Sequence, residues 1–254
     1  MPCYNNARYI LEAIQSVLSQ TYRDFELLII DDASTDNSVE IVQACADPRT
    51  RLVRNDNNRG IAAVRNQLLS LAKGRFLTSL DGDDIYCSPQ KLEKELSLIQ
   101  TTDTTSTPVI VYSDVQWITA SGQFISQVSR SASPREGLIF QGLLDRAIMI
   151  PRDFLLSADL ARDVGGFDES LPIYEDWDYK LRLARKAHFA YTNHVAIGYR
   201  RHGAGLSAVS KAKHAHYQGL IKRKYGIHGF ERGSMDWARN IIQKSSLLAS
   251  NKAA

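Results

Sequence analysis

The stretch that decides the fold is "FELLIIDD", residues 25–32. It joins a short, continuous apolar run to two acids, a pattern typical of a strand that is covered on both faces. The next segment, "STDNSVEIVQACA" at residues 34–46, opens with helix-capping residues and continues with helical spacing. A buried strand followed at once by a helix predicts one unit of an α/β sheet.

The alternation of strand and helix continues on both sides of this unit. "ARYILEAIQSVLSQ", residues 7–20, places Ile10, Ile14, Val17 and Leu18 on one face of a helix. Such alternation predicts a Rossmann-like, mostly parallel central sheet flanked by helices, with ligands outside the carboxyl ends of the strands. Further helices are expected at residues 60–74, with Gly74 as the stop, and at residues 89–100, and further strands at residues 50–55 and 75–80.

The pattern changes after residue 108. "VIVYSDVQWIT" and "GQFISQV" flank an Ala-Ser-Gly turn and predict an antiparallel hairpin. An amphipathic helix is expected after "YEDWD", another strand at "FAYTNHVAIGYRRH", and a basic helical tail from about residue 210. The second half therefore predicts a smaller, antiparallel portion beside the sheet.

Composition and charge exclude several classes of protein. The chain has 254 residues, 31 basic against 28 acidic, and the net charge of +3 is too small to favour a nucleic-acid partner. Three cysteines without a CxxC pair favour a reducing compartment over a disulfide framework or a zinc site. No signal-peptide pattern and no apolar run of about 18 residues is present. These features predict a cytoplasmic protein.

Three acids crowd the end of the run "RFLTSL": Asp81, Asp83 and Asp84. One interpretation is a turn, for which Asp and Gly are well suited. The other is a cation site, because hard divalent ions prefer several carboxylate oxygens. Since Asp31 and Asp32 also follow a strand, we expect both acidic clusters to face one crevice, which favours the site.

Five motifs in order resemble the family 2 glycosyltransferases, the inverting enzymes with the GT-A fold. They are the opening segment at residues 2–36, "NRGIAAVRN", "LDGDD", "GGFDESLPIYEDWDYKLRLA" and "YRRHGAGLS". The resemblance covers residues 2 to about 208. It implies a GT-A domain over residues 1–208, with a nucleotide-sugar-binding half at 1–100 and an acceptor half with the catalytic base at 108–208, followed by a basic helical tail at 209–254.

The resemblance implies a donor site for a nucleotide-diphosphate sugar, a UDP-sugar above all. Asp32 would accept a hydrogen bond from the nucleobase, or be a simple turn acid. Arg65 matches the family's nucleotide-contacting arginine, and a guanidinium suits oxyanions, but it could also be a solvated helix charge. The resemblance also assigns Pro2, Tyr4 and Asn5 to the base pocket and Asp81 to the ribose and cation region.

The resemblance implies a Mg²⁺ or Mn²⁺ cofactor that offsets the charge of the leaving diphosphate. Asp83 would bind the metal directly and Asp81 would lie beside it, whereas Asp84 supports the metal or caps the next helix. His202 binds the metal or the diphosphate, or is structural. Asp176, the second acid of "ED", is the implied catalytic base that deprotonates the acceptor hydroxyl; an ordinary helix-start acid is the alternative.

One departure from the family concerns its first strand, an apolar run before the "P-x-YN" segment. Here Pro2 follows Met1, so we expect that strand to be absent and its neighbours, "FELLIIDD" and "RFLTSL", to lack a partner. The function expected is metal-dependent, inverting sugar transfer to a glycan or lipid-linked acceptor. The alternatives are a non-catalytic nucleotide-sugar-binding remnant and a nucleotidyltransferase. The basic tail gives a possible peripheral contact with the inner face of the membrane.

Overall fold

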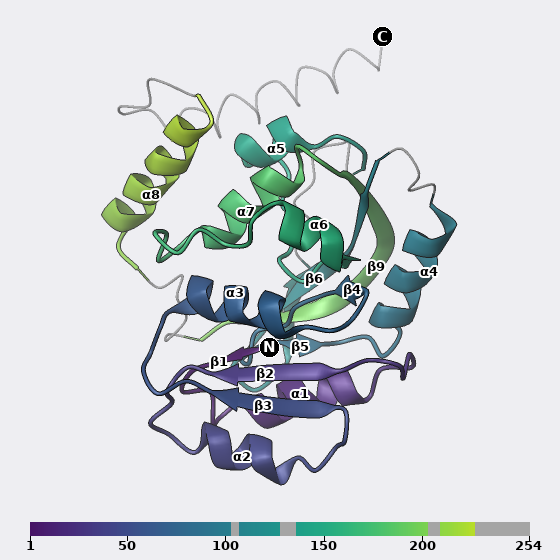
Figure 1. Ribbon diagram of the computed structural model, residues 1–254, viewed down its shortest axis with the longest axis vertical. Helices are drawn as coiled ribbons and strands as arrows, with labels where there is room; N and C mark the ends of the chain where they lie inside the picture. The colour runs from purple at the N-terminus through teal and green to yellow at the C-terminus, as the bar shows by residue number, and fades with distance from the viewer. Residues whose placement is uncertain (103–106, 128–135, 203–208, 227–254) are drawn as a thin grey trace. The chain divides into compact units, whose positions relative to one another are not determined.

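The computed structural model describes residues 1–102, 107–127, 136–202 and 209–226 (Figure 1). The chain divides into two compact units, Met1–Val209 and Ser210–Ala254. In the second unit the described part is helix α8 (Lys211–Lys224), which begins where the Ser210 hydroxyl accepts a hydrogen bond from Lys213 N. The helix expected from about residue 210 is therefore present, and the rest of the expected tail lies outside the described residues.

The first sheet has the parallel strand order β1-β2-β3. Its central strand β2 is buried along its length, as expected from the apolar run at residues 25–32. Strand β1 consists of Pro2 and Cys3, which pair with Ile30 and Asp31, so β2 has a partner at these two residues although the run "FELLIIDD" was expected to lack one on this side. The elements of this half are β1 (Pro2–Cys3), α1 (Ile10–Leu18), β2 (Leu27–Asp31), α2 (Ser38–Ala44), β3 (Thr50–Arg54) and α3 (Ile61–Leu71).

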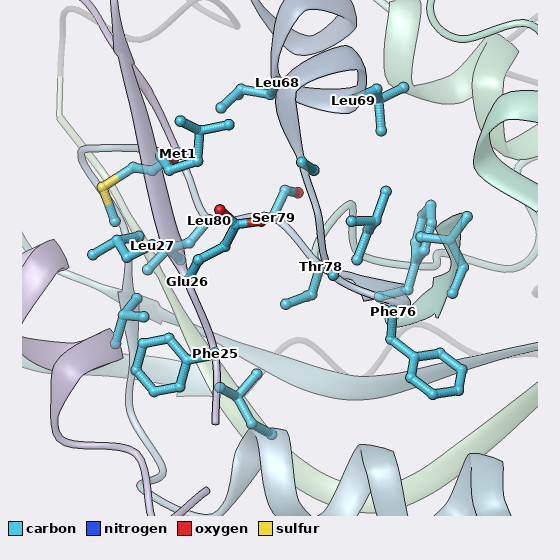
Figure 2. Close-up of a pocket in the computed structure, with 18 of the residues that line it drawn as sticks. Met1, Phe25, Glu26, Leu27, Leu68, Leu69, Phe76, Thr78, Ser79 and Leu80 are labelled. Atoms are coloured by element: carbon cyan, nitrogen blue, oxygen red, sulfur yellow. Dashed lines mark hydrogen bonds between the residues drawn. The ribbon is translucent and has the colours of Figure 1, made fainter. Parts of the chain in front are cut away.

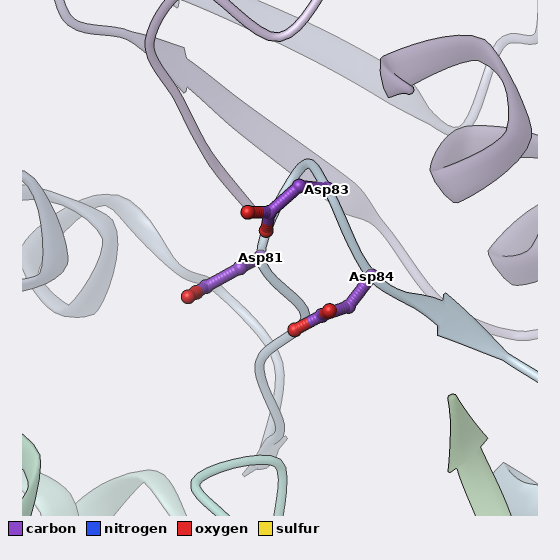
Figure 3. Close-up of side chains that lie close together, drawn as sticks. All are labelled: Asp81, Asp83 and Asp84. Atoms are coloured by element: carbon purple, nitrogen blue, oxygen red, sulfur yellow. The ribbon is translucent and has the colours of Figure 1, made fainter. Parts of the chain in front are cut away.

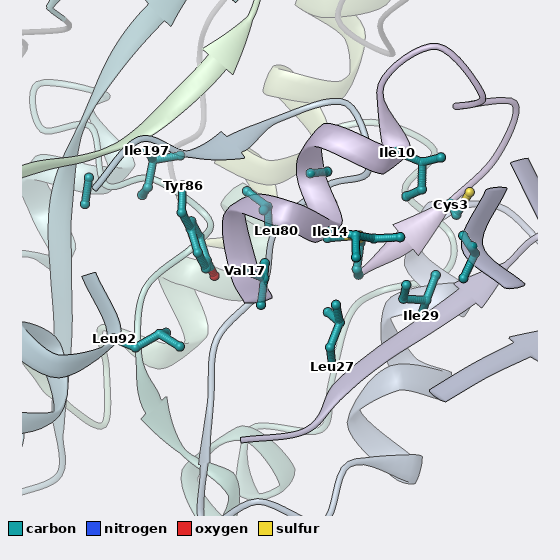
Figure 4. Packing of buried hydrophobic residues seen from close by; sticks show 14 of the residues in the cluster. Cys3, Ile10, Ile14, Val17, Leu27, Ile29, Leu80, Tyr86, Leu92 and Ile197 are labelled. Carbon is teal, nitrogen blue, oxygen red and sulfur yellow. The ribbon is translucent and has the colours of Figure 1, made fainter. Parts of the chain in front are cut away.

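The main core packs helix α1 against one face of this sheet (Figure 4). Ile10 and Ile14 are fully buried against Ile29 of β2. Val42 of α2 belongs to the same cluster. Helix α3 contacts β1 and β2 but contributes no residue to this cluster. The helical spacing of apolar residues thus places α1 as expected.

The segment at residues 75–80 departs from the expected parallel strand. Only Phe76 and Leu77 form a strand, β4, and it pairs antiparallel with β8 (Leu156–Ser157). Beyond it, the hydroxyls of Thr78 and Ser79 donate to backbone carbonyls of residues 153 and 152. These side-chain hydrogen bonds replace the backbone hydrogen bonds of a strand pair. They hold the chain just before residues 81–84, which we call the acidic loop.

Helix α3 also departs from the expected end. It ends at Leu71, and Ala72 is extended, so Gly74 is not the stop. The backbone N–H of Lys73 donates instead to Glu26 Oε1, at 2.6 Å. A side chain from the segment before β2 therefore supports the chain just after α3.

The third sheet has the order β5-β9-β6-β7. Strands β6 and β7 form the expected hairpin, and β9 pairs parallel with β6 and antiparallel with β5. Because β5 directly follows the acidic loop, its pairing brings the end of β9 to that loop. The strands are β5 (Ile85–Tyr86), β6 (Val109–Ile118), β7 (Phe124–Gln127) and β9 (His188–Arg200).

The remaining helices of the first unit are α4 (Lys91–Thr101), α5 (Phe140–Leu144), α6 (Ala158–Asp163) and α7 (Glu175–Leu183). Asn66 ties helix α3 to the loop before α7. Its amide donates to Phe167 O at 2.9 Å and accepts from Phe167 N at 2.6 Å. A Cβ at Gly166 would lie 2.5 Å from Asn66 Oδ1, and Gly166 has a φ of +69°. Glycine is therefore required beside this clamp.

In the described parts of the chain, none of the helices combines the length and the apolar character that crossing a membrane demands.

Candidate active site

The three acids of the loop between β4 and β5 converge on one point (Figure 3). Asp81, Asp83 and Asp84 each offer a carboxylate oxygen, and these oxygens lie within 4.8 Å of one another. Opposite ligands of a Mg²⁺ ion are about 4.2 Å apart, given Mg–O distances of about 2.1 Å. The acid cluster, as we call these three residues, therefore fits one hard divalent cation after a small adjustment.

Two arginines balance the charge of the acid cluster. Arg65 of α3 donates to both oxygens of Asp81, at 3.0 and 3.1 Å, and Arg152 Nε lies 3.0 Å from Asp81 Oδ2. Arg152 also pairs with Asp84. Burial alone would raise the pKa of Asp81, but Arg152 and Arg65 outweigh it, so that pKa is lowered. Burial raises the pKa of Asp84 well above its usual range, against the opposing effect of Arg152.

The end of strand β9 supplies two further partners. His202 Nε2 lies 2.9 Å from Asp83 Oδ2, so the structure places His202 beside the acid cluster, and its binding of the metal or the diphosphate stays a prediction. The backbone N–H of Arg200 donates to Asp84 Oδ1 at 2.7 Å, and its Nε donates to Asp83 O at 2.8 Å. The conformation of the acidic loop therefore depends on β9.

The N-terminal segment lies against the same loop. A Cβ on Gly82 would lie 3.1 Å from Pro2 O and 3.0 Å from Asn6 Oδ1, so a side chain here would need these neighbours to shift by a few tenths of an ångström. Tyr4 is 47% exposed, and Asn5 has a φ of +52° with its N–H donating to a serine hydroxyl. Pro2 thus lies against the acidic loop, and Tyr4, which is exposed, and Asn5 follow it in the chain; their predicted role in a base pocket stays a prediction.

Asp32 is occupied by contacts of its own. Its carboxylate accepts hydrogen bonds from Asn55 Nδ2 at 2.9 Å, Arg59 N at 3.0 Å and Gly60 N at 2.9 Å. These donors fill most of the accepting capacity of a carboxylate. Asp32 therefore holds the loop that leads into α3, and its predicted bond to a nucleobase stays a prediction.

Glu175 and Asp176 begin helix α7 and form the second group of acids. Glu175 pairs with Arg65, which thereby joins Asp81 to the start of α7. Burial raises the pKa of Glu175 despite this arginine. Asp176 Oδ2 accepts from Lys180 Nζ at 2.8 Å. Burial would raise the pKa of Asp176, but the charge and hydrogen bond of Lys180 lower it below its usual range.

Three site residues escaped the sequence interpretation: Arg152, Lys180 and Arg200. Lys180 follows Asp176 by four positions. This spacing predicts a helical ion pair, so the partner of Asp176 can be recognised from the sequence. Arg200 stands in the quoted "YRRH" motif without an assigned role. Arg152 has no signal in the sequence, since it meets Asp81 and Asp84 through the tertiary fold alone.

The sequence matches the model of a family described as "Glycosyl transferase family 2" over residues 1–165. It is 30% identical over 176 residues to "Glycosyltransferase GlyG" of Streptococcus pneumoniae, covering 65% of this chain and 57% of that protein. It is 43% identical over 99 residues to "UDP-Glc:alpha-D-GlcNAc-diphosphoundecaprenol beta-1,3-glucosyltransferase WfgD" of Escherichia coli, covering 39% of each chain. This chain therefore spans little more than half, or less, of these two relatives.

Among solved structures, the fold is similar to that of S. aureus TarS 1-349 in complex with UDP-GlcNAc. The TM-score is 0.67 at 20% identity, over 82% of this chain and 60% of the TarS 1-349 chain. A complex of the same TarS fragment with UDP gives a TM-score of 0.64 at 20% identity, over 87% of this chain and 62% of the fragment. The predicted α/β fold of the GT-A kind is confirmed.

Proposed function

Because this chain belongs to glycosyl transferase family 2, we propose that it transfers a sugar from a nucleotide-diphosphate donor to a hydroxyl acceptor, with inversion at the sugar. The observation that carries the proposal is the position of Arg65, which pairs with Asp81 of the acid cluster and with Glu175 beside Asp176. One buried side chain thus links a cation-binding region to a candidate base. Sugar transfer needs the cation and the base close to the same sugar–phosphate bond.

A UDP-sugar is the proposed donor. Two named similarities support it: the TarS structures contain UDP or UDP-GlcNAc, and the name of WfgD specifies UDP-Glc. The exposed ring of Tyr4, together with Pro2 and Asn5, offers a surface on which a base can stack. Asp32 would keep the neighbouring loop in shape, and Arg65 and Asp81 would face the ribose and phosphates.

The proposed cofactor is Mg²⁺ or Mn²⁺, held by Asp83 and Asp81 with His202 beside them. The convergence of three carboxylates supports it. When bound, the ion supplies positive charge that stabilises the leaving diphosphate. His202 and Arg152, which now pair with the acids, would be free to turn toward phosphate oxygens once the carboxylates are engaged.

Asp176 is the proposed base. Its side chain is 30% exposed, whereas that of Glu175 is 8% exposed and pairs with Arg65, so Asp176 is the acid with access to an acceptor. Lys180 keeps it ionised. The carboxylate would take the proton of the acceptor hydroxyl while the oxygen attacks the sugar carbon opposite the leaving diphosphate.

A glycan or lipid-linked acceptor is proposed, since the name of WfgD specifies a diphosphoundecaprenol-linked one. A cytoplasmic location at the inner face of the membrane accords with such an acceptor. Helix α8 carries basic residues without an acid, which suits a contact with anionic lipid. These residues are Lys211, Lys213, Lys222, Arg223 and Lys224.

The test separates transfer from binding. Calorimetry with UDP-sugars and with other nucleotide sugars, each with and without Mn²⁺, measures donor affinity. Release of UDP with and without a lipid-linked acceptor measures hydrolysis and transfer. Selective binding of a UDP-sugar together with acceptor-dependent release supports the proposal. Binding without any release would favour the non-catalytic remnant, and release of diphosphate from a nucleoside triphosphate and a sugar phosphate would favour the nucleotidyltransferase.

A further inference from the structure

Asp176 lines two cavities of the first unit, and the two differ in character. The larger, of about 660 Å³, has a mostly apolar wall, as Figure 2 shows for Leu27, Leu68 and Phe76. The smaller, of about 200 Å³, is lined by three cations and three aromatic rings, and we call it the cationic pocket. These six residues are Arg146, Arg152, Lys180, Tyr174, Trp177 and Tyr199. A polar acceptor therefore suits the cationic pocket better than the larger cavity.

Two of the three cations already have acidic partners. Arg152 pairs with two members of the acid cluster, and Lys180 pairs with Asp176. Arg146 is exposed and forms no ion pair within the part of the chain that the structure describes. The cationic pocket thus keeps one positive charge that no described acid balances, and such a charge attracts an anion.

Two aromatic rings hold the guanidinium of Arg146. Its Cζ lies 5.2 Å from the ring centroid of Tyr174 and 5.3 Å from that of Trp177. These two rings meet edge to face, and Trp177 Nε1 donates to Leu143 O at 2.8 Å, which fixes the indole. A cation–π contact within about 6 Å positions a cation without neutralising its charge. The guanidinium therefore keeps its planar set of N–H donors for a ligand.

The backbone is strained on both sides of this contact. Arg146, just after α5, has a φ of +58°, and Tyr174, just before α7, has a φ of +67°. The left-handed region is unfavourable for bulky side chains, and residues held there gather at ligand sites. Two strained residues from distant segments thus meet at one guanidinium, which favours a binding role over ordinary packing.

The size of the cationic pocket limits what it can hold. Its volume of about 200 Å³ is below the range of about 300–1,000 Å³ that is usual for whole ligands. It therefore suits one sugar unit of an acceptor and not a longer glycan. Since Asp176 and Arg146 line the same small pocket, one sugar unit can reach both of them.

We propose that Arg146 binds a phosphate group of the acceptor, one sugar unit away from the hydroxyl that Asp176 deprotonates. Tyr174 and Trp177 hold the guanidinium in place for this contact. The acceptor is then a sugar phosphate or a sugar diphosphate and not a neutral glycan, because a phosphate offers two oxygens to the planar fork of an arginine. The inference rests on the proposed function, since it names the class of acceptor.

The first experiment measures binding without turnover. Glucose 1-phosphate and N-acetylglucosamine 1-phosphate are titrated into the full chain with UDP and Mn²⁺ present, so that the proposed donor side is occupied. We expect Arg146→Met and Arg146→Asn to weaken binding by at least about tenfold, because a charge-assisted contact is lost. Asparagine tolerates the left-handed backbone, so this variant separates the charge from backbone effects.

Two controls accompany these titrations. Arg201→Met removes another exposed arginine that lies over an aromatic ring, and it should bind the sugar phosphates as the wild type does. The methyl glycosides of the same two sugars carry no charge, and their weaker binding should be equal in all variants. Methyl glucuronoside carries a carboxylate instead of a phosphate, and it should bind more weakly than the sugar phosphates.

The second experiment measures transfer to the same sugars linked through a diphosphate to a phenoxyundecyl chain. In both Arg146 variants the KM of this acceptor should rise about tenfold, while kcat and the KM of the donor change little. An Arg146 effect on both the lipid-linked and the free phosphates places recognition in the phosphate itself. An effect on the lipid-linked form alone makes the lipid diphosphate the ligand.

Several results would overturn the proposal. They are wild-type binding of neither phosphate probe, equal binding of the phosphates by the wild type and both Arg146 variants, and an equal loss for the neutral glycosides. Binding of methyl glucuronoside that is as tight and as dependent on Arg146 would assign the subsite to a carboxylate instead. Phosphate binding that depends on Arg146 without any transfer would keep the subsite and reject the proposed function. Transfer with an unchanged acceptor KM in both variants would do the reverse.

Discussion

The acid cluster and Asp176 both bring negative charge to the candidate active site, but they are held in different ways. The cluster is balanced from distant elements: Arg152, and His202 after β9. Asp176 is balanced by Lys180, one turn along its own helix. The difference indicates that the cluster depends on the tertiary structure, which accords with the proposed shared cation. Asp176 is held by local structure and keeps one accessible carboxylate, which accords with its proposed role as the base.

Removing the accessible carboxylate should have the largest effect. We expect Asp176→Asn to lower the rate of transfer by about 10²–10⁴-fold, the usual contribution of a general base, and to leave donor affinity nearly unchanged. Transfer rates and calorimetry on the same samples measure both quantities. Asp178→Asn is a poor comparison because Asp178 is buried, so the exposed Asp159→Asn is the matched control. Transfer by Asp176→Asn within threefold of wild type would show that another group is the base.

Removing one acid of the cluster should instead weaken donor binding. We expect Asp83→Asn to weaken Mn²⁺-dependent binding of a nucleotide diphosphate by about 10–100-fold, because it deletes a charged ligand from a three-acid site. Calorimetry with Mn²⁺ and with EDTA gives the comparison, and Asp159→Asn again serves as control. Equal affinity of the wild type in Mn²⁺ and in EDTA would show that donor binding does not require a divalent metal.

Removing the contacts of Arg200 with the acid cluster should weaken Mn²⁺ binding less than Asp83→Asn does, but should lower the stability of the fold more. In Arg200→Met the carbonyl of Asp83 loses its donor, and we expect a loss of about 1–3 kcal/mol in the free energy of unfolding. We also expect a few-fold loss of Mn²⁺ affinity. Its neighbour Arg201→Met is the control, since Arg201 is exposed and stacks on Trp117. Denaturant unfolding and calorimetry measure the two effects; identical behaviour of both variants would contradict the role of Arg200.

Removing the ion pair of Lys180 with Asp176 should change the pH profile of kcat/KM more than the rate of transfer well above its acid limb. Lys180 lowers the pKa of Asp176, whereas burial raises it. In Lys180→Met the burial effect is left unopposed by this lysine, so the carboxyl protonates at higher pH and the acid limb of kcat/KM moves upward. At pH values well above that limb the loss should be small. Lys186→Met, an exposed lysine paired with Asp163, is the control. An acid limb at the same pH in both variants would show that Lys180 does not set this pKa.

The parts of the molecule that the sequence could predict are those encoded by neighbouring residues. The apolar run before Asp31 specifies a covered strand, and the spacing of Ile10 and Ile14 specifies the helix that packs on it. The acid cluster could be predicted because its members lie within four positions of one another. Asp176 stands out only through a motif, since an acid at the start of a helix is common, and its role as the base stays a prediction.

The remaining features depend on contacts between distant residues. Arg152 meets Asp84 across 68 positions, and Arg200 meets it across 116. No local period encodes these distances. The shortness of β4 likewise results from hydroxyl bonds of Thr78 and Ser79 to a distant loop, which an apolar pattern does not record.

The clamp between Asn66 and Phe167 has a consequence for protein engineering. The two halves of the first unit look exchangeable, since one carries the proposed donor residues and the other the proposed base. Asn66, however, occupies the space that any side chain at position 166 would need. A chimaera that combines this nucleotide half with the acceptor half of another family member must therefore inherit the Gly-Phe pair at 166–167 along with Asn66. Recombination points that separate them should lower the stability of the chimaera, whatever the match of the two active-site halves.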